Sequence, residues 1–148
     1  KILSIMLFCA VLSRIMFGYI SDIIGPLKTL LIGSTLQMMT LILFIPFNNL
    51  TGLYVVSILF GLSQGGIVPS YALIVKRYLP NKDAAERIGL IIFFTIIGMS
   101  IGGWMSGKIY DYTNSYTLGF LNSILWNLLN VIIIFYLFIS FKKSKVSI

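Results

Sequence analysis

The sequence contains no histidine and a single cysteine, Cys9, and only four of its 148 residues are acidic. Without histidine the chain cannot form a histidine-based metal site or the triad of many hydrolases, and one cysteine excludes an intrachain disulfide or a CxxC redox pair. All four carboxylates fall in or beside expected loops: Asp22, Asp83, Glu86 and Asp111. We therefore expect no metal, no cofactor and no enzymatic activity.

Charge of either sign is also scarce, because charged residues make up 10% of the chain and hydrophobic residues 58%. Soluble domains carry about 25% charged residues. The few charges leave uncharged apolar runs longer than the roughly 18 residues that indicate a membrane-spanning helix. The sequence predicts an all-α membrane protein with five transmembrane helices, at about 2–21, 29–47, 52–75, 88–109 and 116–141, and a basic tail at 142–148.

The net charge of +7 does not indicate a nucleic-acid partner, since the basic residues lie between the apolar runs and not along one face. Five spans place the two ends of the chain on opposite sides of the bilayer. Lys1 and Lys108 fall on one side. The other side holds Lys28, Lys76, Arg77, Lys82, Arg87, Lys142, Lys143 and Lys145. Basic residues collect in cytoplasmic loops. We therefore expect a plasma (inner) membrane protein with a cytoplasmic C-terminus.

Arg14 lies inside the first apolar run, where an ionised guanidinium costs at least ~2.5–3.5 kcal/mol. Three interpretations are open: Arg14 binds substrate, pairs with a carboxylate elsewhere in a longer protein, or extends to water. It lies about 12 Å deeper than Asp22 at ~1.5 Å per helical residue, which disfavours the last. Substrate binding is favoured, because a guanidinium forms two parallel hydrogen bonds with a carboxylate and stays charged.

The pattern Gly18-x-x-x-Asp22-x-x-Gly25, with Lys28 after it, ends the first run. It resembles the cytoplasmic loop motif of the major facilitator superfamily, in the weaker copy between helices eight and nine. The resemblance implies a conformational latch, in which the aspartate meets the N-terminus of a neighbouring helix and the glycine at 18 admits another backbone. The alternative is an ordinary solvated carboxylate.

The fourth run carries four glycines at spacings that flatten one helix face: Gly98, Gly102, Gly103 and Gly107. Small residues four apart predict close packing between membrane helices. The stretch from Gly103 to Asp111, followed by Ser115 and Tyr116, is similar to the segment after helix eleven in the same family. A functional interpretation goes further: a neighbouring helix would slide along this face during transport.

The third run contains Ser63, Gln64, Gly65, Gly66 and Pro69. Proline removes a backbone donor and bends a helix, and the glycines soften it. We expect a bent helix that acts as a gate. Its two polar side chains either face the substrate or bond neighbouring helices. Three asparagines in the fifth run are expected to make hydrogen bonds between helices: Asn122, Asn127 and Asn130.

The resemblance covers the whole chain as helices eight to twelve of a twelve-helix facilitator, so we expect a fragment whose N-terminal part is missing. Arg14, four residues before Gly18, looks like helix eight of the monocarboxylate porters and oxalate/formate antiporters. Ala10 stands where the porters carry an aspartate, and no lysine precedes Lys108 in the fourth run.

This resemblance implies a symporter or antiporter for a small organic anion such as a monocarboxylate, bound by Arg14. From the polar residues of the third run, we expect Gln64 and Ser63 to contribute to the same site. Any coupling proton would titrate a group in the missing part, since no expected span contains a carboxylate. The alternative is a facilitator for a sugar or drug, in which Arg14 forms a structural ion pair.

Overall fold

The computed structural model describes residues 1–47 and 49–146, and in that range the chain is helical with no strand. The elements are α1 (Ile2–Ile24), α2 (Pro26–Leu43), α3 (Leu50–Gln64), α4 (Ile67–Tyr78), the short 3-10 helix η1 (Asn81–Asp83), α5 (Ala84–Thr113) and α6 (Tyr116–Val146). Five segments are long and apolar enough to cross a membrane, with α3 and α4 forming one of them. The predicted all-α membrane fold is confirmed.

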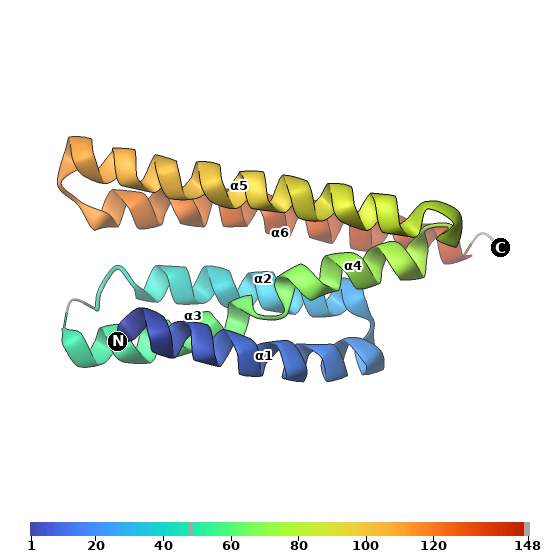
Figure 1. The fold of residues 1–148 in the computed structure, drawn as a ribbon, viewed down its shortest axis with the longest axis horizontal. Helices are drawn as coiled ribbons and strands as arrows, with labels where there is room; N and C mark the ends of the chain where they lie inside the picture. The colour runs from blue at the N-terminus through green and yellow to red at the C-terminus, as the bar shows by residue number, and fades with distance from the viewer. Residues whose placement is uncertain (48, 147–148) are drawn as a thin grey trace.

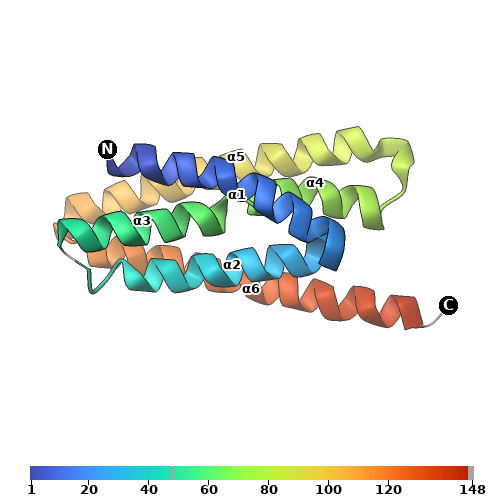
Figure 2. The ribbon, with the colours of Figure 1, turned by 90° about the horizontal axis from the view of Figure 1, so that it is seen from below.

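The helices run along one long axis, with α2 in the middle of the bundle (Figure 1). The pair α5 and α6 lies on one side of α2, and α1 and α3 lie on the other. The turned view places the α1–α2 turn, the α4–α5 connection and the later part of α6 toward the same end (Figure 2). The expected basic loops therefore share one end of the bundle.

A tight turn joins α1 to α2 at Gly25 and Pro26. Gly25 has a φ of 91°, a left-handed conformation that a side chain disfavours, and its N–H donates to the carbonyl of Ser21 over 3.0 Å. Pro26 occupies the first position of α2, where its missing N–H costs no helical hydrogen bond. The helix reaches Ile24, so Asp22 lies in the last turn of α1 and not in a loop.

The third apolar run forms two helices, with a break at Gly65 and Gly66. Pro69 explains the position of the break, because it has no N–H to donate to the carbonyl of Gly65 and its ring crowds that carbonyl. Both glycines keep right-handed backbone angles, so the chain changes direction without leaving the helical region of conformational space. The break therefore requires little local rearrangement, although whether it acts as a gate stays a prediction.

Among the described residues, eight of the buried side chains are serines or threonines and nine are apolar, whereas many more large apolar side chains face outward. The most enclosed hydroxyl residues are Thr29 and Ser34 on α2 and Ser13 on α1. Several such hydroxyls donate to a carbonyl one turn earlier, as Thr29 does to Gly25 over 2.9 Å. Small residues let membrane helices approach closely, and lipid accepts the outer apolar side chains at no cost. The pattern fits a bundle surrounded by hydrocarbon.

Two amide hydrogen bonds hold α6 against α2. The Nδ2 of Asn127 donates to the Oε1 of Gln37 over 2.8 Å, and the Nδ2 of Asn130 donates to the hydroxyl of Ser34 over 3.2 Å. The expected interhelical role is thus confirmed for these two asparagines. Asn122 forms no side-chain hydrogen bond within the described part of the chain.

We predict that Asn127→Ala destabilises the protein by about 0.6–1.7 kcal/mol, the range for interhelical hydrogen bonds in membranes. Reversible unfolding in detergent, followed by helical circular dichroism, measures the change. Asn122→Ala is the matched control on the same helix, and a loss as large as that of Asn127→Ala would contradict the importance of the α2–α6 bond.

Candidate functional site

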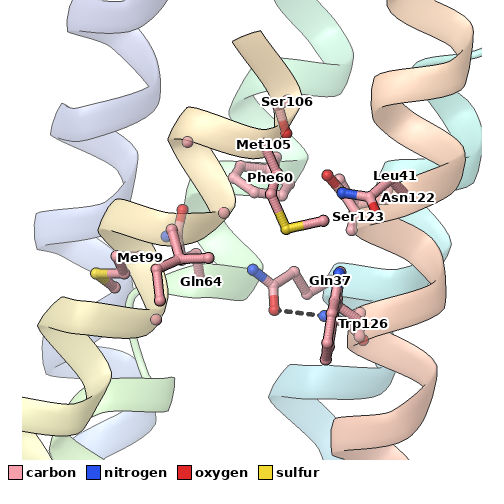
Figure 3. A pocket seen from close by; sticks show the side chains of 15 residues that line it. Gln37, Leu41, Phe60, Gln64, Met99, Met105, Ser106, Asn122, Ser123 and Trp126 are labelled. Atoms are coloured by element: carbon pink, nitrogen blue, oxygen red, sulfur yellow. Dashed lines mark hydrogen bonds between the residues drawn. The ribbon is translucent and has the colours of Figure 1, made fainter. Parts of the chain in front are cut away.

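Four helices surround a cavity of about 760 Å³. The lining residues come from α2, α3, α5 and α6, so residues far apart in the sequence face one another (Figure 3). Phe60, Met105 and Trp126 supply much of its apolar surface. A pocket of this size and mainly apolar character is in the range that holds small molecules.

The polar groups in this cavity are amides and hydroxyls, with no charged side chain among the lining residues. They are Gln37, Gln64, Ser106, Asn122, Ser123 and Asn127. The Oδ1 of Asn127 is buried without a hydrogen-bond partner among the described residues, while its Nδ2 donates to Gln37. An enclosed acceptor without a donor is costly. The cavity therefore offers uncharged hydrogen-bond donors and acceptors and no cation.

The two polar residues at the end of α3 have different surroundings. Gln64 lines the cavity, on the opposite side from Gln37 (Figure 3). Ser63 is buried, donates its hydroxyl to the carbonyl of Phe60 over 2.9 Å and lies 3.5 Å from the hydroxyl of Thr40. Gln64 can therefore meet a ligand in this conformation, whereas Ser63 joins α3 to α2.

Arg14 does not lie in the cavity. It is exposed on α1, beside the face formed by Cys9, Ser13 and Phe17 that packs against α3 and α4. Among the described residues the one salt bridge joins Arg87 to Asp83, so Arg14 meets no carboxylate in this part of the protein. The structure thus separates Arg14 from Gln64 and leaves the guanidinium free to face a ligand or another part of the protein.

Among the described residues, no helix makes the close contact with the glycines of α5 that their spacing predicts, so their packing role stays a prediction. A Cβ added at Gly98, Gly102, Gly103 or Gly107 would meet open space, and no residue of α5 is buried. Close contacts occur instead at Gly61 and Gly65, which lie against the backbone of α1. Their four-residue spacing is the same small-residue signal, and it could have identified this contact from the sequence.

The latch residues lie beside the basic end of α4. Asp22 shares a hollow of about 250 Å³ with both basic residues of that last turn, and the lining is Ser21, Asp22, Pro26, Leu73, Lys76 and Arg77. The guanidinium of Arg77 lies over Gly25, 3.3 Å from where a Cβ would stand. Asp22 therefore lies near two side-chain cations without forming a salt bridge to either among the described residues, and its contact with a helix N-terminus stays a prediction.

The other two latch residues, Gly18 and Lys28, make fewer contacts among the described residues. Lys28 is exposed and is not among the residues that line the hollow. No atom approaches the position of a Cβ at Gly18 within 4 Å, so the expected close backbone approach is absent from the described part of the chain. Their predicted roles depend on contacts beyond these residues.

Comparison with known proteins gives one family and one distant relative. The family model described as Major Facilitator Superfamily matches residues 2–147. Monocarboxylate transporter 13 of Rattus norvegicus is 25% identical over 121 residues, which cover 80% of this chain and 28% of that protein. The chain thus spans less than a third of the relative's length. No solved structure matches significantly.

We predict that Gly25→Ala destabilises the protein by roughly 1–2 kcal/mol, because alanine disfavours a φ of 91° and its Cβ would press on Arg77. Gly18→Ala, seven residues earlier and inside α1, is the control and should cost nothing, since its Cβ enters open space. Thermal unfolding of the two variants in detergent measures the difference. Equal stability of both variants would show that the turn tolerates a side chain.

Proposed function

Because the chain belongs to the major facilitator superfamily, we propose that the whole protein is a secondary transporter of a small organic anion such as a monocarboxylate. Members of this family are transporters and not enzymes. A transporter of this kind binds its substrate near the bilayer midplane between two halves and alternates between inward-open and outward-open states. The described helices would supply one part of that path.

The observation that carries the proposal is the isolated charge of Arg14. It lies in the middle of α1, exposed and without a carboxylate partner in the described part of the chain. An unpaired cation at this depth is costly, and such residues mark substrate or ion pathways. A carboxylate ligand would offset that cost through a bidentate, charge-assisted pair. The distant relative named as a monocarboxylate transporter supports the same substrate class.

The arrangement of Arg14 and Gln64 limits what each can contribute. Gln64 lies in an uncharged cavity and Arg14 lies outside it. We infer that Arg14 supplies the charge that binds the anion, while Gln64 donates to or accepts from a polar group of the substrate in a conformation that brings the two closer. Ser63 contributes indirectly by holding α3 to Thr40.

The alternative is a facilitator of an uncharged or cationic solute, with Arg14 paired to a carboxylate from another part of the protein. The uncharged amides of the cavity favour this alternative, since they suit a sugar or drug. The two functions differ in what neutralises Arg14, which is the ligand in one and a structural partner in the other.

The latch hypothesis also belongs to this proposal. Asp22 and the basic pair of α4 lie in one hollow at the end that we expect to be cytoplasmic. Attraction between them would hold α1 and α4 together at that end in one transport state. Movement to the other state would separate the two helices.

The first test uses the full-length protein and a panel of acetate, lactate and pyruvate. We expect ligand-dependent thermal stabilisation of the wild type, because a ligand that binds only the folded state raises stability by RT ln(1 + [L]/Kd). Arg14→Gln should abolish this stabilisation and the uptake of the same ligand into proteoliposomes. Arg87→Gln removes a cation in the first turn of α5 and should leave both unchanged.

A different result would favour the alternative. If no member of the panel stabilises the wild type, and Arg14→Gln melts well below it without ligand, then Arg14 is a structural ion-pair partner. The anion proposal would then be abandoned in favour of a neutral or cationic substrate.

For the latch we predict that Asp22→Asn slows uptake by about 5- to 10-fold while ligand affinity changes little, because the variant alters the balance between two states. Uptake rates and thermal stabilisation, measured side by side, separate these effects. Asp111→Asn, near the opposite end of the bundle, serves as the control. An uptake rate for Asp22→Asn equal to that of the control would identify an ordinary solvated carboxylate.

A further inference from the structure

α1 meets the α3–α4 segment at its break. A Cβ at Gly65 would stand 2.7 Å from the Cβ of Ser13, and a Cβ at Gly66 would overlap the ring of Phe17. Phe17 also lies 3.2 Å from a Cβ position at Gly33 of α2, so its ring fills the junction of three helices. Glycine is needed at the break for this close approach and not for its backbone angles.

A hydrogen bond joins the same two segments. The hydroxyl of Ser13 donates to the carbonyl of Leu62. Leu62 is in the last turn of α3, where carbonyls have no donor within their own helix. Ser13 is 1% exposed and Phe17 8% exposed, so both contacts are shielded from the surroundings. A side chain of α1 therefore supplies the hydrogen-bond donor that α3 itself cannot provide at its C-terminal end.

These contacts lie directly beside the residue that we propose binds the anion. Arg14 stands between Ser13 and Phe17 on one turn of α1, and α1 is unbroken through this region. On the other side of the contact, Gln64 lies immediately before the break and lines the cavity. A shift of α1 at Arg14 must move Ser13 and Phe17, and these contact the residues that fix the direction of α4.

We propose that Ser13 and Phe17 are positioning residues that couple the occupancy of Arg14 to the angle between α3 and α4. When a ligand binds the guanidinium and shifts α1, the Phe17 ring moves relative to Gly66. The end of α3 then changes direction, and Gln64 turns with it. The inference rests on the proposed function, since it assigns Arg14 a ligand. The inference adds to that function the two residues through which ligand binding at Arg14 would change the shape of the transport path.

The test places spin labels at Leu59 on α3 and at Leu79, the C-terminal cap of α4, both exposed, in the full-length protein otherwise free of reactive cysteines. The ligand is whichever of acetate, lactate and pyruvate gives the largest thermal stabilisation. We expect this ligand to shift the label-to-label distance in the wild type. Phe17→Ala should broaden the distance distribution, remove the shift and lower turnover about tenfold, with ligand affinity kept within about threefold.

Three further variants test whether Phe17→Ala acts only by destabilising the protein in general. Phe8→Ala removes the same side chain from an outward face of α1, 65% exposed, and should behave as wild type. Gly66→Ala should also lower turnover, because its methyl displaces the ring. In Gly66→Ala/Phe17→Ala the methyl occupies part of the space left by the ring, so the pair should show a smaller loss than the product of the two single losses.

The outcomes separate the two proposals. A wild type that neither takes up nor responds to any of the three carboxylates would overturn the anion function, and the coupling to Arg14 with it. A wild type that transports, together with a Phe17→Ala variant of normal turnover and unbroadened distances, would overturn the coupling alone. Independent effects of Gly66→Ala and Phe17→Ala would also overturn it.

Discussion

The close approach of α1 to α3 determines where the functional side chains of this chain lie. In a bilayer no hydrophobic force drives helices together, so pairing depends on packing of small residues and on hydrogen bonds. Gly61 and Gly65 lie against the backbone of α1, and Ser13 donates to the carbonyl of Leu62. This contact fixes the face that α1 turns inward and leaves Arg14 outside it. It also fixes the end of α3, which places Gln64 in the cavity.

Much of the fold could be predicted from the sequence, because hydrocarbon imposes simple requirements. A span needs about 20 apolar residues and a fully bonded backbone, so uncharged runs identify the helices. Local chemistry identified the breaks, as at Gly25 with Pro26 and at Gly65 with Pro69. The ends were less predictable, since α1 includes Asp22 and α5 begins at Ala84, before the last loop charges. Charged residues can extend a helix beyond the hydrocarbon.

The relation between site residues was not predictable in the same way. In a membrane both lipid-facing and buried positions tolerate apolar residues, so the pattern of α1 does not reveal which face meets α3. The glycines of α5 and those of α3 carry the same spacing, yet only the latter have a neighbour among the described helices. Glycines four residues apart show that another helix can pack closely against that face. Whether one does depends on the surface of the neighbouring helix.

In the proposed anion transporter, the separation of Arg14 from the amide-lined cavity would constrain the transport mechanism. A charged substrate held by Arg14 loses water, and the cavity offers no charge to stabilise it if it moves there alone. The anion would therefore remain paired with the guanidinium while polar groups such as Gln64 approach it. The break after Gln64 is where such an approach can occur, because Gly65 and Gly66 tolerate a change of angle and Ser13 and Phe17 link it to α1. If the proposed function holds, this arrangement favours movement of the helices around an ion pair at Arg14 over passage of a free anion along the cavity.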